Sequence, residues 1–307
     1  MTSNDPDDNA RAFLDAFDSI KTTDVSASRT DTFNSEDDFN GLLVELLIEV
    51  GSFICVAANL LPHDRRWSRN EAILGGHVVR LYKLISALLD QICQHRREIT
   101  FIIARLAFEC IVNLRFLLKY ADDPSVFNSY VAYSMKNERR LQDKIEERIA
   151  DREGKVLPVE TRMLNSIARV AKASGMRIED VAASRPKEWA DKNLFERAEA
   201  VGLGEAYLGA FRGPSASVHG NWMDLLEFQL DTDHEEATFA PSFEWRNPRP
   251  QIAQTIAHLA IEAARDYFDY LGDGPLDFID ERFDELSSRI LQAAKAHEEY
   301  LVKSGAL

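Results

Sequence analysis

The sequence predicts an all-α protein. Apolar residues recur at helical spacing along nearly the whole chain from Glu36 onward. The signals between these segments are ones that end helices. Leu61-Pro62 closes the first segment, because the residue before a proline avoids the α region, and Gly272-Asp273-Gly274-Pro275 separates the last two. The chain shows no convincing strand pattern and no internal repeat, so we expect a multi-helix bundle without a significant sheet.

The same periodicity places the individual helices. Ser68, followed by Glu71, forms a capping-box pattern at the start of the second helix. The segment 124–153 carries many charges of both signs, which is typical of a long exposed helix. The expected helices cover residues 37–61, 68–94, 97–121, 124–153, 158–174, 177–189, 193–202, 205–211, 214–229, 250–271 and 276–303.

We expect an acidic arm followed by a helical domain. The first 40 residues hold ten acidic and three basic side chains, and residues 1–35 have few large apolar groups, which predicts a flexible N-terminal arm. Residues 36–303 are long enough to form a single helical domain with one large core. Within it, residues 155–205 are less apolar and predict a small lobe or insertion of short helices.

The formal net charge of −15 argues against non-specific binding to nucleic acid or to an anionic membrane. It does not exclude RNA at a local basic groove. The first residues lack a basic segment followed by an apolar run, so we expect no secretory signal. Residues 42–61 are long and apolar enough to span a bilayer, but Glu45 and Glu49 give them the polar stripe of a core helix, and we expect no membrane span.

The three cysteines, Cys55, Cys93 and Cys110, lie on apolar helical patterns without a CxxC pair. We expect them to be buried and reduced, which favours a cytoplasmic location. The sequence has no P-loop, no GxGxxG opening a helix, no HExxH, no Glu-x-x-His and no Gly-x-Ser-x-Gly. It therefore predicts neither a metal nor a cofactor.

The stretch from Ala210 to Trp222 is the best candidate for chemistry. Gly213-Pro214 ends one helix and starts another, and this places Ser215 and His219 on one face near the new N-terminus. Arg212 stands before the break, and Asn221 follows the histidine. A positive helix end, a guanidinium and an imidazole predict an anion or phosphate site. The alternative is a core histidine bonded to Ser215 or to a carbonyl.

Two apolar helices carry narrow polar stripes that would suit the same cavity. Because a buried charge needs a partner, Arg105 is expected to pair with Glu109 or with a carboxylate across the bundle. A structural salt-bridge network is the alternative, and the functional interpretation requires both stripes to converge on His219. The stripes are Arg105, Glu109 and Asn113 on 97–121, and His77, Arg80, Lys83 and Ser86 on 68–94.

Residues 230–250 form a long segment without helical periodicity, in which Phe239, Phe243 and Trp245 are interleaved with prolines. A long aromatic loop in a helical protein usually lies across a groove and is often functional.

These motifs resemble a family of bacterial all-helical proteins known as a domain of unknown function. The shared features are Arg-x3-Glu (Arg105 to Glu109), Arg-x2-Lys on the preceding helix (Arg80 to Lys83), and Ser-x3-His-Gly followed by an aromatic residue (Ser215 to Trp222). The resemblance covers roughly residues 65–270. It implies an all-helical fold and carries no established activity.

Arg212-x6-His219 is also similar to the Arg-x4–6-His motif of HEPN-type helical ribonuclease domains. That resemblance implies a metal-independent dimer, in which the histidine assists attack by the RNA 2′-hydroxyl and the arginine stabilises the phosphorane. The chain departs from the family's usual pattern in having Gly213 after the arginine and Pro214 within the motif.

Two hypotheses follow. The first is a toxin-like or antiphage ribonuclease using His219 and Arg212, supported by Ser215, Asn221, Arg105, Glu109, Arg80 and Lys83. It predicts a local basic groove for RNA and a homodimer. The second is a non-catalytic helical module that binds a protein or small ligand, with the polar cluster as architecture or anion pocket and the acidic N-terminal arm as a contact for a protein partner.

Overall fold

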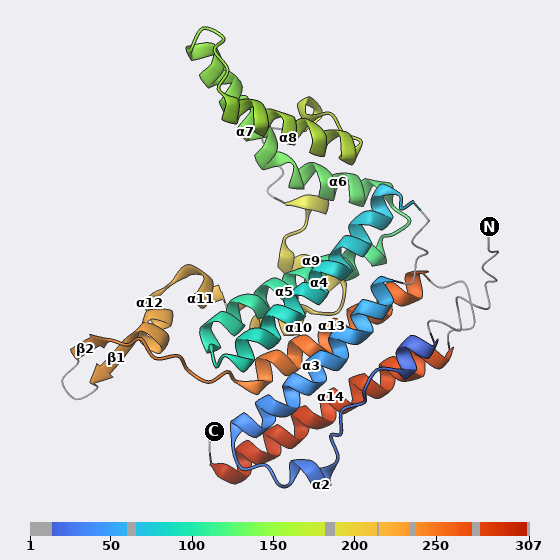
Figure 1. The fold of residues 1–307 in the computed structure, drawn as a ribbon, viewed down its shortest axis with the longest axis vertical. Helices are drawn as coiled ribbons and strands as arrows, with labels where there is room; N and C mark the ends of the chain where they lie inside the picture. Colours follow the sequence, from blue (N-terminus) through green and yellow to red (C-terminus); the bar gives the residue numbers. More distant parts are fainter. Residues whose placement is uncertain are drawn as a thin grey trace.

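Long helices form the body of the protein (Figure 1). The computed structural model describes residues 14–59, 66–181, 188–213, 215–233, 238–271 and 277–305. The long helices of the body are α3 (Glu36–Ala58), α4 (Arg69–Cys93), α5 (Arg97–Lys119), α13 (Pro250–Leu271) and α14 (Asp277–Ser304). The all-α prediction is confirmed.

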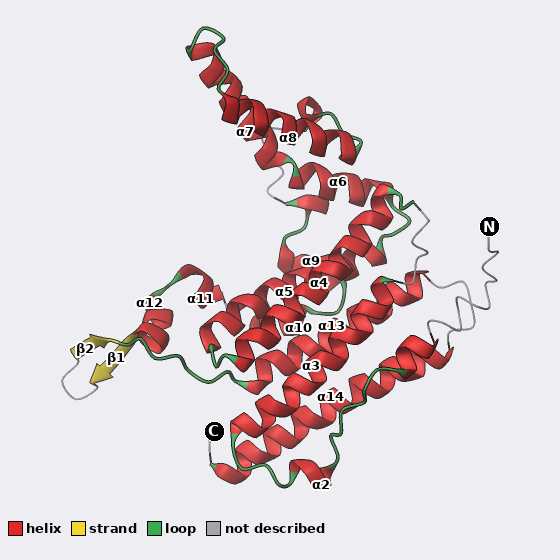
Figure 2. Cartoon of the chain, viewed as in Figure 1, coloured by secondary structure: helices red, strands yellow, loops and turns green. Residues whose placement is uncertain are grey.

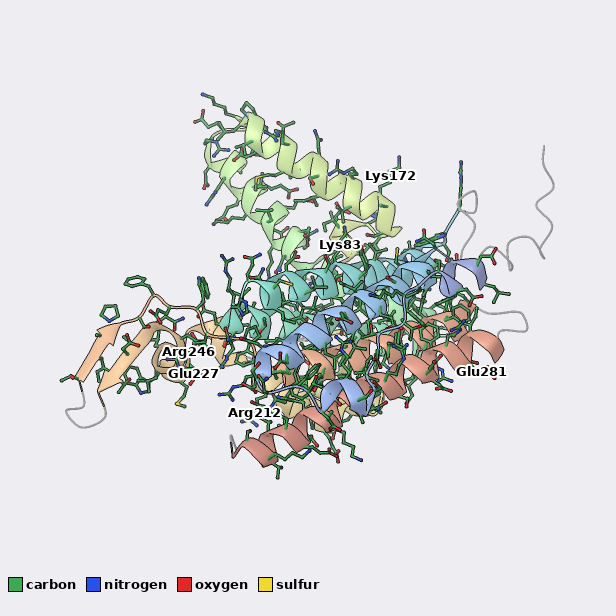
Figure 3. The ribbon with its side chains drawn as sticks, turned by 60° about the horizontal axis from the view of Figure 1, so that its bottom comes forward. Lys83, Lys172, Arg212, Glu227, Arg246 and Glu281 are labelled. Atoms are coloured by element: carbon green, nitrogen blue, oxygen red, sulfur yellow. The ribbon has the colours of Figure 1, made fainter. Side chains whose placement is uncertain are left out.

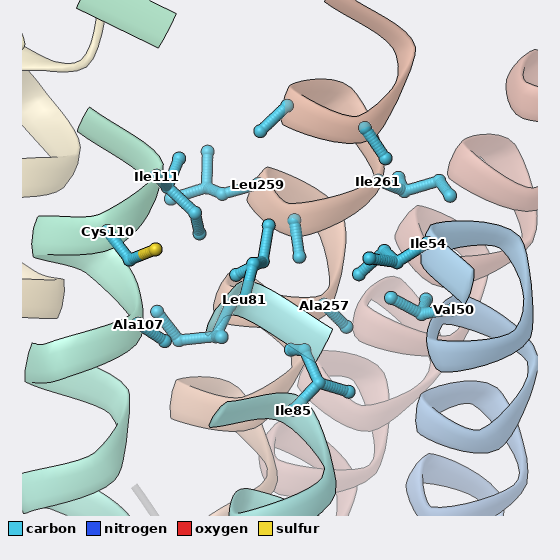
Figure 4. Close-up of a cluster of buried hydrophobic side chains, with 14 of the residues drawn as sticks. Val50, Ile54, Leu81, Ile85, Ala107, Cys110, Ile111, Ala257, Leu259 and Ile261 are labelled. Carbon is cyan, nitrogen blue, oxygen red and sulfur yellow. The ribbon is translucent and has the colours of Figure 1, made fainter. Parts of the chain in front are cut away.

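The core lies where α3, α4, α5 and α13 meet, and Figure 4 shows side chains from all four helices packed against one another. Leu46, Leu81 and Ile111 are completely buried. Each such side chain contributes about 1.5–3 kcal/mol relative to an exposed one. The apolar periodicity of the sequence therefore becomes one continuous core, and this core fixes the relative positions of α4 and α5.

Side-chain caps set where two of these helices begin. The predicted Ser68–Glu71 capping box is present: the Ser68 hydroxyl accepts a hydrogen bond from the Glu71 amide, and the Glu71 carboxylate accepts one from the Ser68 amide. Ser35 and Asp38 form the same arrangement at the start of α3. Such caps satisfy amides that have no partner within the helix.

Residues 14–35 pack on the bundle instead of forming the flexible segment that the sequence predicted. They contain a helical turn at 14–18 and α2 (Ala27–Thr30). Phe17 and Val25 are buried in the core, where Phe17 contacts the rings of Phe53 and Phe283. A few well-placed apolar residues thus anchor an otherwise polar segment. Residues 1–13 of the predicted arm lie outside the described residues.

An arm of α6 (Pro124–Ser134), α7 (Lys136–Asp151) and α8 (Pro158–Ser174) projects from one end of the bundle (Figure 1). The predicted helix 124–153 is broken at Met135, whose side chain is buried. The arm has a small apolar cluster of its own. This cluster consists of Val131, Met135, Ile167, Ala171, Ile178 and Val181.

Short elements lead the chain back to α5. They are η1 (Ile178–Asp180), η2 (Trp189–Asp191), α9 (Leu194–Ala200), α10 (Gly204–Tyr207) and the π-helical turn η3 (Leu208–Arg212). The predicted helix 177–189 is therefore wrong where the structure describes it. Its residues 182–187 lie outside the described part of the chain.

The predicted helix 214–229 is also broken. It is replaced by α11 (Ser215–His219), α12 (Trp222–Asp224) and the π-helical turn η4 (Leu225–Gln229). The break falls at Gly220, whose φ of +58° ends α11. Asn221 then caps α12 by accepting a hydrogen bond from the Asp224 amide over 3.1 Å.

One small sheet follows, which the sequence analysis missed. Strands β1 (Leu230–Asp233) and β2 (Thr238–Pro241) pair antiparallel, with Leu230 opposite Pro241 and Asp233 opposite Thr238 (Figure 2). The sequence did not predict this hairpin because its strands are short and β2 is exposed throughout. The expectation of no significant sheet holds for the rest of the described chain.

The three cysteines differ in their exposure to solvent. Cys110 is buried as expected, whereas Cys55 and Cys93 are exposed, because they lie on the outer faces of α3 and α4. Among the described helices, α3 and α4 are each long and apolar enough to cross a membrane. Within this bundle 56% of the most apolar stretch of α3 is buried and 39% of that of α4, so both also serve as core helices.

A buried ion pair joins α3 to α14. Arg289 donates to Glu49 over 2.7 Å, and the Thr23 amide donates to the same carboxylate over 3.0 Å. Glu49 is only 2% exposed. Removing one partner of such a pair leaves an uncompensated buried charge, which is strongly destabilising.

We therefore expect Glu49→Gln to lower the free energy of unfolding by about 3 kcal/mol in urea titrations. Glu45→Gln is the matched control, one helical turn earlier, where the pair with Arg29 is partly exposed. This control substitution should lower the free energy of unfolding by less than about 1 kcal/mol. Equal losses for the two variants would show that burial does not set the strength of the Glu49 pair.

Candidate ligand-binding site

The polar stripe of α5 faces two different places. Arg105 points to α11, whereas Glu109 and Asn113 line a cavity on the side of the arm. Arg80 of α4 lines this cavity as well, and Lys83 is exposed. In Figure 3, Lys83 lies on the side of the bundle that carries the arm, apart from Arg212. The functional interpretation of the stripes required them to converge on His219, and the described residues do not show this convergence.

Arg105 anchors the start of α11. Its Nε donates to the Ser215 hydroxyl over 3.1 Å, and that hydroxyl donates to the Phe211 carbonyl over 2.7 Å. The Arg105 guanidinium also lies over the Phe211 ring, 4.3 Å from its centroid. Arg105 thus has no ion pair with Glu109. It is held by a hydroxyl and a ring, and it fixes the Phe211–Ser215 turn.

His219 and Arg212 are both exposed, and neither side chain forms a hydrogen bond or ion pair with any described residue. The bond from the His219 side chain to Ser215 or to a carbonyl, which belongs to the alternative interpretation, is therefore not present in the described part of the chain. Helix α11 has only five residues, so its N-terminus offers much less of the helix dipole than the predicted anion site required. This site thus has an exposed guanidinium and an exposed imidazole on neighbouring turns.

The second candidate site is a cavity of about 620 Å³ between the bundle and the arm. We call it the arginine cavity. Its walls come from α4, α5, α6, α7, η2 and α9. The lining residues are His77, Arg80, Leu106, Glu109, Cys110, Asn113, Tyr130, Tyr133, Ser134, Lys136, Asn137, Arg140, Trp189 and Arg197.

The lining of the arginine cavity is strongly cationic. Arg80, Lys136, Arg140 and Arg197 face a single carboxylate, that of Glu109. Elsewhere the protein is acidic, with a net charge of −15. Arginines gathered around one concave site, against the overall charge, indicate an anionic ligand.

Arg197 is the most unusual of these side chains, because it is only 6% exposed. One of its terminal nitrogens donates to the Lys192 carbonyl, and its guanidinium lies 4.4 Å from the centroid of the Trp189 ring. Its Nε has no hydrogen-bond partner in the described structure. Burial lowers the pKa of Arg197, although an arginine stays charged at any ordinary pH. A buried cationic donor without a partner is costly, which suggests that a ligand completes the site.

Strained backbone holds Trp189 in place. The two following residues, Ala190 and Asp191, both have a φ of +53°, a region that residues other than glycine seldom adopt. The Ala190 amide donates to the Ser129 hydroxyl of α6 over 2.7 Å, which ties this turn to the arm. Strain of this kind is often found where a binding site is formed.

His77, Cys110 and Tyr130 form a largely buried part of the lining, next to Trp189. His77 Nε2 lies 3.0 Å from the Tyr130 hydroxyl, and the Cys110 thiol lies 3.6 Å from His77 Nδ1. Burial, assisted by the nearby charge of Arg80, lowers the pKa of His77 to about 4. Burial likewise raises the pKa of Cys110 to about 12. Both groups are therefore neutral at physiological pH, and this wall hydrogen-bonds without adding charge.

The sequence had pointed to part of this site through His77, Arg80, Glu109 and Asn113 on their two stripes. It gave no signal for Trp189 and Arg197, which lie in the weakly apolar stretch that predicted only a lobe of short helices. Trp189 and Arg197 are far from α5 along the chain, so the sequence does not show that they line the same cavity as α5. Among the described residues, no group of three or more His, Cys, Asp or Glu side chains is placed to hold a metal ion.

The fold and this site define the class of protein: a helical bundle with a side arm and a cationic cavity where the two meet. The model of a family of unknown function, DUF5677, matches residues 71–237. This match covers more than half of the chain, so the chain belongs to that family. It begins within α4, extends past β1, and includes every described residue that lines the arginine cavity.

No curated protein and no solved structure matches the chain. The resemblance to HEPN-type domains is therefore not shown by any of these comparisons.

The depressed pKa of His77 predicts a pH dependence of stability. The folded pKa of about 4 lies below the ordinary value of 6.5, so protonation favours unfolding. The contribution of the neutral imidazole is fully present above pH 6.5 and is lost as the pH falls toward 4. Between pH 7 and pH 5 we expect the wild type to lose about 2 kcal/mol more than His77→Gln in urea unfolding. Parallel losses in the two proteins would contradict the assignment.

Proposed function

We propose that this protein binds a small anionic ligand in the arginine cavity. The observation that carries the proposal is Arg197, a buried cation whose Nε has no hydrogen-bond partner in the described structure and which lines a cationic cavity. An oxygen of the ligand would accept a hydrogen bond from this nitrogen, and the anionic group would lie among the cationic side chains of the lining. Arg80 and Arg140 are exposed at the rim of the cavity and would meet the ligand as it enters.

The size and composition of the cavity support the same proposal. Small-molecule sites commonly measure about 300–1,000 Å³ and combine apolar or aromatic walls with a few placed polar groups. The arginine cavity has this volume, and Tyr130, Tyr133 and Trp189 supply its rings. Because its walls come from both bundle and arm, a bound ligand would also hold the arm in one orientation.

Anion binding is tested by thermal unfolding and calorimetry with inorganic phosphate and pyrophosphate at low ionic strength. We expect both to raise the unfolding temperature of the wild type, because a ligand that binds only the folded state stabilises it. Arg197→Met and Arg80→Met should each weaken binding by about tenfold or more, the equivalent of one charged hydrogen bond.

Lys83→Met is the matched control, one helical turn after Arg80 and outside the cavity lining. It should leave the affinity unchanged. Equal weakening by Lys83→Met and Arg80→Met would mean that the anions respond to surface charge alone, and the proposal would fail.

A second candidate function is metal-independent RNA cleavage at α11. The observation that favours it is the solvent exposure of both His219 and Arg212. His219 would take the proton of an RNA 2′-hydroxyl as this oxygen bonds to the adjacent phosphorus, and Arg212 would stabilise the charged phosphorane. The bond to the 5′-oxygen would then break, and this oxygen would take a proton from water, which leaves a 2′,3′-cyclic phosphate and a 5′-hydroxyl end.

Exposed aromatic side chains near α11 offer a surface for the bases. Trp222 and Phe239 contact each other edge to face, and Arg96 lies over the Trp245 ring, 5.0 Å from its centroid. Phe243 is almost fully exposed. Single-stranded nucleic acids stack on such rings, and a homodimer would place two α11 sites on one substrate. Under this function we place the protein in the cytoplasm, where RNA is available.

The ribonuclease is tested by incubating total RNA with the full chain in EDTA. We expect the wild type to cut RNA and His219→Ala to lose at least about a hundredfold in rate, in line with the loss of a general base. His95→Ala is the control, since His95 is an exposed histidine outside α11. Absence of cleavage by the wild type, or equal cleavage by wild type and His219→Ala, would exclude this candidate.

A further inference from the structure

The polar groups that line the arginine cavity differ in how deeply they are buried. Arg80 and Arg140 are exposed at the rim, whereas Arg197 is buried and Glu109 is half-buried. The side-chain oxygen of Asn113 is fully buried. The exposed arginines at the rim suit the negative charge of a ligand, whereas the inner end, where Arg197 and Glu109 carry opposite charges, suits neutral polar groups.

The inner groups specify more than an anion. The Asn113 oxygen has no hydrogen-bond partner in the described structure, and the carboxylate of Glu109 forms no hydrogen bond or ion pair there. Both are acceptors and require N–H or O–H donors from the ligand. Arg197 Nε is an unpaired donor and requires an acceptor. A bare phosphate would pair with Arg197 but would leave the two acceptors without partners.

Glu109 and Arg197 lie close enough to interact electrostatically, yet they form no salt bridge. The Glu109 carboxylate and the Arg197 Nε are therefore both open to a third group, while another nitrogen of the Arg197 guanidinium donates to the Lys192 carbonyl. Asn113 follows Glu109 by one helical turn on α5 and lines the same cavity. The inner end of the cavity thus offers two acceptors and one donor within a small space.

Among the common nucleobases, guanine has the complementary edge. Its Watson–Crick edge presents two neighbouring N–H donors and one carbonyl acceptor, whereas adenine, cytosine and uracil each present one donor position there. The aromatic rings of Tyr130, Tyr133 and Trp189 in the lining suit a flat heterocycle. A cavity of about 620 Å³ has room for one nucleotide.

We propose that the arginine cavity binds a guanine nucleotide, with the base against Glu109, Asn113 and Arg197 and the phosphate toward Arg80 and Arg140. This inference rests on the proposed anion-binding function of the same cavity. It adds that the base is recognised. The base amino and imino groups donate to Glu109 and Asn113, and the base carbonyl accepts from Arg197.

Calorimetry on the full chain with GMP, AMP, ribose 5-phosphate and inorganic phosphate tests both anion binding and recognition of the guanine base. We expect GMP to bind at least about tenfold more tightly than AMP and than ribose 5-phosphate, the gain from one to two good hydrogen bonds. If ribose 5-phosphate or AMP binds as tightly as GMP, recognition of guanine is overturned, while anion binding stands. If none of the four binds, the proposed function is overturned together with this inference.

Two variants test the base end and the phosphate end of the site separately. Glu109→Gln replaces one acceptor oxygen by a donor, so it should abolish the preference for GMP over AMP. Arg80→Met should weaken GMP and ribose 5-phosphate by the same factor, because it removes a phosphate contact. Circular dichroism confirms that each variant is folded before titration. A Glu109→Gln protein that still prefers GMP would overturn the proposal.

Discussion

The packing of α5 against α4 and α13 is the constraint on which the rest of the structure depends. Residues such as Ala107, Ile111 and Leu114 are completely buried there, so the helix cannot rotate without exposing a large apolar surface. Its orientation then decides where its polar residues point. Arg105 faces α11, and Glu109 and Asn113 face the arm. Both candidate sites are consequences of this one orientation.

The protein treats its buried charges in two ways. Glu49 is paired with Arg289 and with the Thr23 amide, so its burial stabilises the contact between α3 and α14. Arg197 is nearly as buried but is paired only with a carbonyl and the face of a tryptophan. A charge that is fully paired belongs to the architecture of a fold. One that keeps an open hydrogen-bonding position inside a cavity is better explained by a ligand.

The sequence indicated only some residues of the arginine cavity. Arg80 and Glu109 lie on the stripes of α4 and α5, because helical spacing places such residues on one face. Spacing within a helix does not show which neighbour covers that face, and in the structure these two residues line the arginine cavity. Trp189 and Arg197 come from a stretch whose local pattern was weak, and no local signal connects them to α5. Helical spacing likewise could not predict that His219 is exposed.

The sequence by itself determined the helical class, the extent of the long helices and the Ser68–Glu71 capping box, because these depend on periodicity and on contacts within a few residues. The tertiary structure alone decided the break of α6 and α7 at Met135, the packing of residues 14–35, and the joining of α4, α5 and α9 around one cavity. Those features depend on which buried surfaces meet across long distances in the chain. The free energy of hydrophobic packing decides which surfaces meet, and it does not depend on how far apart the residues are in the sequence.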